Sequence, residues 1–177
     1  MDETLDKAGD AALALAAERP WREVSLRDVA ERAGVDFAEL YAKAPARPLL
    51  VLWLSQKLDR AALATAATPS DDVHDRLFDA MMARIEAMEA HREALIAIVR
   101  SDTPVMLAPH LPRTARAILE AAGIDATPPR LLAMTAVWAR TVQVWRDDEG
   151  ALNRTMAELD KRLKQLRDRL GRIGAGF

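Results

Sequence analysis

The sequence predicts an all-α fold of about nine helices. Half of the 177 residues are hydrophobic but only 5% are aromatic, and alanine and leucine predominate over the β-branched residues that favour strands. Apolar residues also recur every three or four positions along most of the chain, which is the spacing of one helix face. Proline, glycine and short polar stretches separate these periodic segments, four of them in front and five behind.

The first predicted helix covers residues 4–19. Its apolar side chains recur at helical spacing, and they are Leu5, Ala8, Ala12 and Leu15. Pro20 ends the helix, because proline cannot donate the backbone hydrogen bond that would continue it.

The stretch SLRDVAERAGVDFAELYAKA predicts two more short helices joined by a tight turn. Ser25 can cap the first of them, and Asp28 supplies the acidic half of a capping box. Gly34 ends that helix, because glycine accepts a left-handed backbone without steric cost. Asp36 and Glu39 repeat the capping pattern and begin the next helix after a turn of three residues.

The remaining helices are delimited by the same signals. Pro45 ends the third helix, and Pro48 suits the first turn of a fourth. The stretch AATPS, which offers Ser70 as a helix cap, marks a boundary between a domain over residues 1–66 and a helical domain over 70–177. The five helices of the second domain begin at Val73, after a break near His91, near Thr114, after DATPP and near Gly150.

Composition and charge exclude several classes of protein. The net charge of −2 does not suit a chain that coats nucleic acid along its whole surface, so any basic surface is local. The absence of cysteine excludes disulfides and thiolate metal sites, and it suits a reducing compartment. The acidic first twenty residues are unlike a signal peptide, and no apolar run reaches the ~18 residues of a membrane span. We therefore expect a soluble, cytoplasmic protein.

The sequence SLRDVAERAGVDFAELY, preceded by ALALAAERPW and followed by PARPLL, resembles the N-terminal helix-turn-helix domain of the TetR family of repressors. The resemblance implies a homodimer that binds DNA and a second domain that binds a small molecule. It also implies that seven residues lie at the DNA-binding surface, namely Ser25, Arg27, Asp36, Phe37, Tyr41, Lys43 and Arg47. For Tyr41 packing is as reasonable a role as phosphate contact, and Lys43 and Arg47 are also reasonable as solvated surface charges.

Several positions depart from the family pattern. Pro20 replaces the usual glycine, Asp36 replaces a hydroxyl residue, Pro48 replaces an acid, and the segment 42–44 lacks the usual basic and aromatic cluster. Five basic residues balance five acidic ones between residues 21 and 50, so this segment is neutral. Because each neutralised phosphate releases close to one counterion, we expect weak binding with few contacts.

The last two helices predict a dimer interface. Leucine and methionine residues after position 150 follow a four-three heptad spacing, which calls for a partner helix, and the preceding helix offers a matching stripe. Two such pairs related by a two-fold axis would form a four-helix bundle. The predicted interface comprises Leu131, Trp138, Val142, Trp145, Leu152, Met156, Leu159, Leu163 and Leu166.

Methionines in the second domain predict a pocket for a small apolar ligand, because methionine fills irregular spaces. The candidate lining residues are Phe78, Met81, Met82, Ile85, Met106 and Met134. An ordinary hydrophobic core is the simpler interpretation of the same residues.

The C-terminal run VWARTVQVWRDDEGALNRTMAELDKRLKQL is also similar to the end of the lipid-binding accessory proteins of ubiquinone biosynthesis. These proteins share the TetR-like fold without binding DNA. Under this alternative the ligand is a lipid, and the basic last helix with its tail GRIGAGF lies on an anionic membrane surface. Charges that flank a coiled seam and keep it soluble are the simpler interpretation of that helix.

The sequence gives no sign of an enzyme. His74, His91 and His110 stand far apart, and no glycine-rich phosphate loop or clustered nucleophile and base occurs. We therefore expect no catalytic residues, no metal and no cofactor. The acidic pairs 71–72 and 147–148 are interpreted as helix caps.

Overall fold

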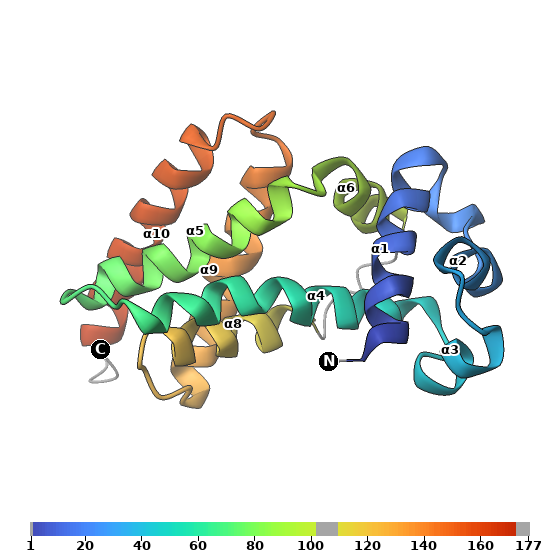
Figure 1. The fold of residues 1–177 in the computed structure, drawn as a ribbon. Coiled ribbons are helices and arrows are strands. Elements are labelled where there is room, and N and C mark those ends of the chain that lie inside the picture. The colour runs from blue at the N-terminus through green and yellow to red at the C-terminus, as the bar shows by residue number, and fades with distance from the viewer. Residues whose placement is uncertain (1, 102–109, 173–177) are drawn as a thin grey trace. The chain divides into compact units, whose positions relative to one another are not determined.

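The structure is a computed structural model that describes residues 2–101 and 110–172, with side chains to residue 169. This described part contains nine α-helices, two short 3₁₀ helices and no strand, which confirms the predicted all-α fold (Figure 1). The α-helices are α1 (Glu3–Glu18), α2 (Leu26–Ala33), α3 (Phe37–Lys43), α4 (Arg47–Ala64), α5 (Val73–Glu89), α6 (Arg92–Ser101), α8 (His110–Ala121), α9 (Pro128–Arg146) and α10 (Asn153–Arg172). The 3₁₀ helices are η1 (Trp21–Glu23) and η2 (Thr65–Ala67).

The chain divides into two compact units. Of the described residues, the first unit contains 2–57 and 90–101, and the second contains 58–89 and 110–172. Helix α6 therefore packs with the N-terminal helices, against α1 and η1, although it follows α5 in the sequence. That residues 1–66 and 70–177 each fold as an independent domain stays a prediction.

The first unit is built around the side chains of α1, α2, α3, α6 and the beginning of α4. Trp21, Val29, Leu40 and Leu50 are fully buried in its core. Burial of each such side chain contributes about 1.5 to 3 kcal/mol, which is the main stabilisation of so small a unit. A Cβ at Gly9 on α1 would lie only 2.9 Å from the side chain of Leu54 on α4, so glycine leaves the space that this leucine occupies.

Capping residues fix the ends of the short helices as the sequence predicts, except that Glu39 forms no capping box with Asp36, because its carboxylate binds Thr4 and Lys43. The Ser25 hydroxyl accepts the backbone N–H of Asp28 at 3.1 Å, and the Asp28 carboxylate accepts the N–H of Ser25 at 2.8 Å. Gly34 ends α2 with a left-handed backbone, φ 63°. The Asp36 carboxylate accepts the N–H of Glu39 at 2.8 Å and begins α3. These local bonds make the α2–α3 geometry a direct consequence of the sequence.

The second unit packs α5, α8, α9, α10 and the end of α4 around one apolar core. Fully buried side chains come from each of the four later helices, among them Met81, Ile118, Met134 and Leu159. Helix α9 packs against both α8 and α10, and α5 packs against both α8 and α10. The second unit is therefore stabilised by contacts between helices far apart in the sequence.

Two helix starts, those of α8 and α10, and the capping residue of α5 differ from the sequence-based expectation. Helix α8 begins at His110, before the predicted Thr114, because Pro112 lies in its first turn, where the missing N–H costs nothing. Helix α5 is capped by the Asp72 carboxylate, which accepts the N–H of His74 at 2.6 Å, while the Ser70 hydroxyl donates to Asp79 instead.

Helix α10 begins at Asn153, three residues after the predicted start near Gly150. The preceding loop has positive φ angles of 47° at Glu149, 85° at Gly150 and 56° at Leu152, which a helix cannot adopt. The buried Asp148 carboxylate accepts the backbone N–H and the hydroxyl of Thr155 at 2.8 and 2.7 Å, which satisfies the first turn of α10.

None of the described helices combines the length and the apolar character that a membrane crossing requires.

Candidate nucleic-acid interface

Helices α2 and α3 and the three residues between them form a helix-turn-helix (Figure 1). The left-handed Gly34 makes the turn, and the N–H of Val35 donates to the carbonyl of Ala30 at 3.1 Å, which completes the end of α2. Leu40 anchors α3 on the core of the first unit. Side chains on the opposite side of α3 are consequently turned towards solvent.

An aromatic pair lies on α3 beside an arginine of α2. The rings of Phe37 and Tyr41 lie 6.0 Å apart, and the Arg27 guanidinium lies 4.6 Å over the Phe37 ring. The Tyr41 side chain is 52% exposed, and Arg27 is exposed with no carboxylate partner in the described part of the chain. These three predicted residues are therefore brought together on one exposed surface, with a cation and a phenol accessible to a ligand.

Lys43 is held by acidic neighbours. Its ammonium nitrogen lies 2.8 Å from the Asp2 carboxylate at the start of α1 and 2.8 Å from the Glu39 carboxylate one turn earlier in α3. It also donates to the Thr4 hydroxyl at 3.2 Å. Asp2, followed by Glu39, raises the pKa of the Lys43 ammonium. The charge of Lys43 is thus largely compensated by Asp2 and Glu39.

Arg47 turns inward from the first turn of α4. Its guanidinium donates to the backbone carbonyls of Trp21 and Val24, the latter at 3.0 Å, and lies 5.4 Å over the Trp21 ring. These bonds tie η1 to the start of α4. The role implied by the family resemblance, contact with phosphate or base, would require breaking them.

The other basic residues of this region are also mostly paired. Arg32 binds Glu18 with two nitrogens, and Arg19 lies 3.0 Å from the Asp28 carboxylate. Ser25 likewise uses its hydroxyl on Asp28, at 2.8 Å. Many of the basic residues in this region therefore form ion pairs with acidic neighbours, which leaves few cations available to bind phosphates.

The candidate ligand residues lie in the core of the second unit. Met81, Met82, Ile85 and Met134 are buried and Phe78 is half-buried, whereas Met106 lies outside the described residues. Their role as a ligand pocket remains a prediction. Two charged residues, Arg84 and Asp59, are also buried in this core. They could not be predicted from the sequence, because no local pattern distinguishes them from solvated surface charges.

The candidate dimer residues are largely used within the protomer. Trp138, Trp145, Leu159, Leu163 and Leu166 are buried in the core of the second unit. The heptad stripe of α10 finds its partner helices, α9 and α5, in the same chain. Leu131, Val142 and Leu152 are half-buried and Met156 is exposed, so these remain available to a second copy.

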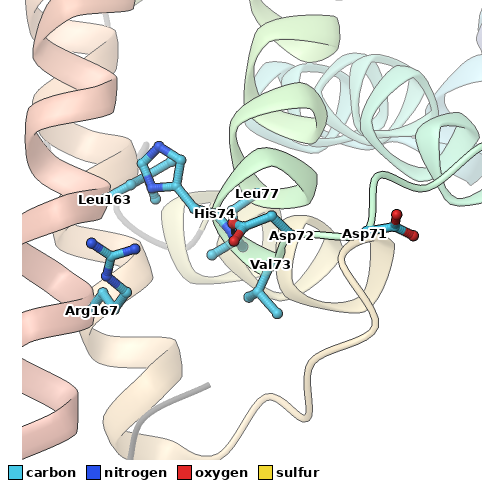
Figure 2. Close-up of a pocket in the computed structure, with 7 residues that line it drawn as sticks. All are labelled: Asp71, Asp72, Val73, His74, Leu77, Leu163 and Arg167. Carbon is cyan, nitrogen blue, oxygen red and sulfur yellow. Dashed lines mark hydrogen bonds between the residues drawn. The ribbon is translucent and has the colours of Figure 1, made fainter.

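A cavity of about 290 Å³ opens where the start of α5 meets the end of α10. Figure 2 shows Leu163 and Arg167 on the pale red helix α10, facing Val73, His74 and Leu77 at the start of the green helix α5. The His74 ring lies 3.0 Å from the Asp160 carboxylate. The other lining residues are Asp71 and Asp72, so none of the predicted pocket residues borders this cavity.

Among the described residues, no three acidic or histidine side chains are grouped closely enough to hold a metal ion.

Residues 10–45 match the sequence model described as bacterial regulatory proteins, tetR family. The matched segment includes the whole helix-turn-helix described above. No protein in the curated collection of sequences matches the chain.

Solved structures of tetR-family regulators share the fold. A TetR transcriptional regulator from Rhodococcus sp. RHA1 is 19% identical, with a TM-score of 0.73 over 93% of this chain and 95% of its own. A tetR-family regulator from Streptomyces coelicolor is 19% identical, with a TM-score of 0.59 over 97% and 84%. The fatty acid degradation regulator FadR from Bacillus halodurans is 15% identical, with a TM-score of 0.60 over 94% and 95%.

Proposed function

We propose that this chain, which carries a tetR-type N-terminal domain on the fold of tetR-family regulators, is a DNA-binding transcriptional regulator. It acts in the cytoplasm as a homodimer and inserts α3 of each copy into the major groove of a pseudo-palindromic site. A small molecule bound in the second unit controls release of the DNA.

One observation carries this proposal: the family match and an intact helix-turn-helix coincide on the same residues. Both helices are capped by their own side chains, and the turn has the left-handed glycine that it requires. The exposed Tyr41 and Arg27 supply a phenol and a guanidinium on the helix pair that would face the DNA. Such groups are common contacts to phosphate oxygens.

The dimer is supported by apolar surface on α9. Leu132 on α9 is 74% exposed, and Met156 at the start of α10 is also exposed. Both side chains lie on the two helices that the sequence pattern assigns to the dimer interface. A second copy of the same helices would cover these side chains by two-fold symmetry.

The affinity for DNA is expected to be modest, with a salt dependence set by a small number of phosphate contacts. Arg27 is the basic residue of the helix-turn-helix that needs no rearrangement to reach a phosphate, whereas Lys43 must exchange Asp2 and Glu39 for DNA. Each phosphate contact adds about 0.9 to the slope of log affinity against log salt concentration. We expect a dimer to give a slope of about 2 to 4 from one or two such contacts per copy.

A genome-wide footprint of the purified protein on fragmented genomic DNA tests the function. The expected result is enrichment of a short pseudo-palindrome whose half-sites are about one helical turn apart, 34 to 36 Å, or a multiple of that distance. Fluorescence anisotropy with the enriched site at increasing salt then measures the slope. Absence of enrichment together with absence of binding at low ionic strength would overturn the proposal.

A second measurement tests the alternative function, that of a lipid-binding accessory protein. Native mass spectrometry of the gently purified protein would show a co-purified isoprenoid or phospholipid if the chain serves as a lipid carrier. That result, combined with no DNA binding, would favour the accessory function. The tail that this alternative assigns to the membrane is residues 171–177, and its part from residue 173 onwards lies outside the described residues.

A further inference from the structure

The exposed face of α3 is apolar. Leu40 is fully buried and holds α3 on the core of the first unit. An α-helix turns by about 100° per residue, so Ala38 and Ala42, two positions before and after Leu40, lie almost opposite it. Both alanines are exposed, as is the Tyr41 ring beside them, and Phe37 is half-buried one turn before Tyr41. These four residues, Phe37, Ala38, Tyr41 and Ala42, are named the α3 apolar face.

The charged side chains of α3 bind one another and the start of α1. The Glu39 carboxylate accepts the hydroxyl of Thr4 and the ammonium of Lys43, the latter at 2.8 Å. The Asp36 carboxylate caps the helix by accepting the N–H of Glu39 at 2.8 Å. Within the described chain, Tyr41 is the α3 residue whose side-chain hydrogen-bonding group has no protein partner. The centre of the α3 apolar face therefore consists of two alanine methyl groups.

Helix α3 lacks the side chains that select purines by hydrogen bonds. Bidentate bonds from arginine or lysine select guanine, and those from asparagine or glutamine select adenine. Of these residue types α3, FAELYAK, contains only Lys43, whose ammonium binds Asp2 and Glu39. A carboxylate could accept the cytosine amine, but that of Glu39 is bound by Lys43 and Thr4. Thymine remains, and it is the base that exposes a methyl group in the major groove.

Two effects favour thymine opposite an alanine methyl group. Contact between the two methyl groups removes apolar area from water. Cytosine instead presents an amine and guanine presents two acceptors at the same edge of the base pair. An alanine surface would exclude water from these polar groups without replacing its hydrogen bonds, which is unfavourable. The same methyl groups therefore attract thymine and disfavour guanine and cytosine.

We propose that the α3 apolar face selects thymine through its 5-methyl group, so that the bases of each half-site opposite Ala38 and Ala42 are thymines. The inference rests on the proposed function and specifies the class of DNA sequence that the chain recognises. Ala38 and Ala42 lie one turn apart, so each contacts a different base. Tyr41 packs its ring beside these contacts, and Arg27, 4.6 Å over the Phe37 ring, binds a phosphate.

Replacement of thymine by deoxyuridine tests the inference, because uracil keeps the base pair and lacks only the methyl group. Fluorescence anisotropy of the full chain compares the footprinted site with a duplex in which every half-site thymine is deoxyuridine. The affinity is expected to fall about fourfold for each methyl group that an alanine contacts. The salt slope should stay unchanged, because no phosphate contact is altered. Equal affinity for the two duplexes would overturn the inference.

Two further duplexes separate thymine selection from other causes. Deoxyuridine in place of thymines outside the half-sites is the matched control and should leave the affinity unchanged. An equal loss in this control would assign the effect to the duplex itself and overturn the inference. Half-sites with 7-deazaguanine lack the N7 acceptor of guanine. Loss of affinity with 7-deazaguanine but not with deoxyuridine would show selection of guanine by hydrogen bonds and refute selection of thymine.

The variants Ala38→Gly and Ala42→Gly remove the methyl group from the protein instead. Glycine destabilises a helix, so the quantity compared is the ratio of affinities for the thymine and deoxyuridine duplexes, measured on one variant at a time. This ratio should fall about fourfold for each methyl contact that is lost. Ala17→Gly is the matched control, because this exposed alanine of α1 lies outside the helix-turn-helix and should preserve the ratio. A ratio unchanged in both α3 variants would assign the contacts to other residues and overturn the inference.

Failure of this inference and failure of the proposed function give different results. A chain that binds its site with the expected salt slope, and binds the deoxyuridine duplex equally well, would keep its function without selecting thymine. A chain that binds no DNA at low ionic strength would overturn both.

Discussion

Releasing Lys43 from its acidic partners should strengthen its contribution to DNA binding. In the unbound protein its ammonium is shared between Asp2 and Glu39, each at 2.8 Å, so a phosphate must displace both. The double variant Asp2→Asn with Glu39→Gln removes the two competing charges. Asparagine is as good a helix cap as aspartate, so the bond from the N–H of Leu5 that begins α1 is retained.

The size of the effect follows from counterion release. One additional phosphate contact per copy steepens the salt slope by about 0.9, or about 1.8 for a dimer. Over a fourfold rise in salt this corresponds to an additional loss of roughly tenfold in affinity, with tighter binding at the low-salt end. Fluorescence anisotropy on the footprinted site at 50 to 200 mM salt, roughly the range in which such slopes are measured, would resolve this difference.

The matched control is Glu3→Gln, which removes a negative charge from the same turn of α1 but pairs with Lys7 instead of Lys43. It should change the slope little. If the double variant leaves the slope of log affinity against log salt concentration unchanged, Lys43 does not contact DNA. If Glu3→Gln changes this slope as much as the double variant does, the effect comes from net charge and not from Lys43.

Three further predictions concern the first unit, which carries the helix-turn-helix, and the dimer. Arg47→Ala should lower the free energy of unfolding by about 1.5 to 3 kcal/mol in thermal or urea denaturation, because two backbone carbonyls lose a charged donor. The salt dependence of DNA binding should stay unchanged, and a weaker salt dependence would instead show that Arg47 contacts phosphate. Gly34→Ala should cost about 1 to 2 kcal/mol by the same measurement, because φ is 63° and the added Cβ meets open space, so any effect is backbone strain. Leu132→Glu should shift the protein from dimer to monomer in sedimentation velocity. Leu63→Glu, which changes an exposed leucine on α4, should not. If the Leu132→Glu variant remains a dimer, the interface lies elsewhere.

The ends of the N-terminal helices could be predicted from the sequence because their causes are local. Ser25, Asp28, Gly34 and Asp36 act on backbone groups within three or four residues of themselves, and the structure confirms each of these bonds or angles. The predicted role of Glu39 in the capping box of α3 is wrong. Its side chain binds Lys43 and Thr4 rather than the backbone of its own helix start, which depends on where α1 lies.

Roles that depend on distant packing could not be predicted. The heptad leucines of α10 indicate that a partner helix exists but not in which chain it lies, and the protomer itself supplies α9 and α5. Arg84 and Asp59 are separated by 25 residues and become a pair only when α4 and α5 pack together. No periodicity or spacing distinguishes such residues from the solvated charges on the same helices.

Tyr41 is the single tyrosine of the chain, and its ring lies exposed on α3. Fluorotyrosine incorporated during expression would accordingly give one ¹⁹F resonance without any engineered label or assignment step. Its chemical shift and linewidth would follow α3 during a titration with oligonucleotide.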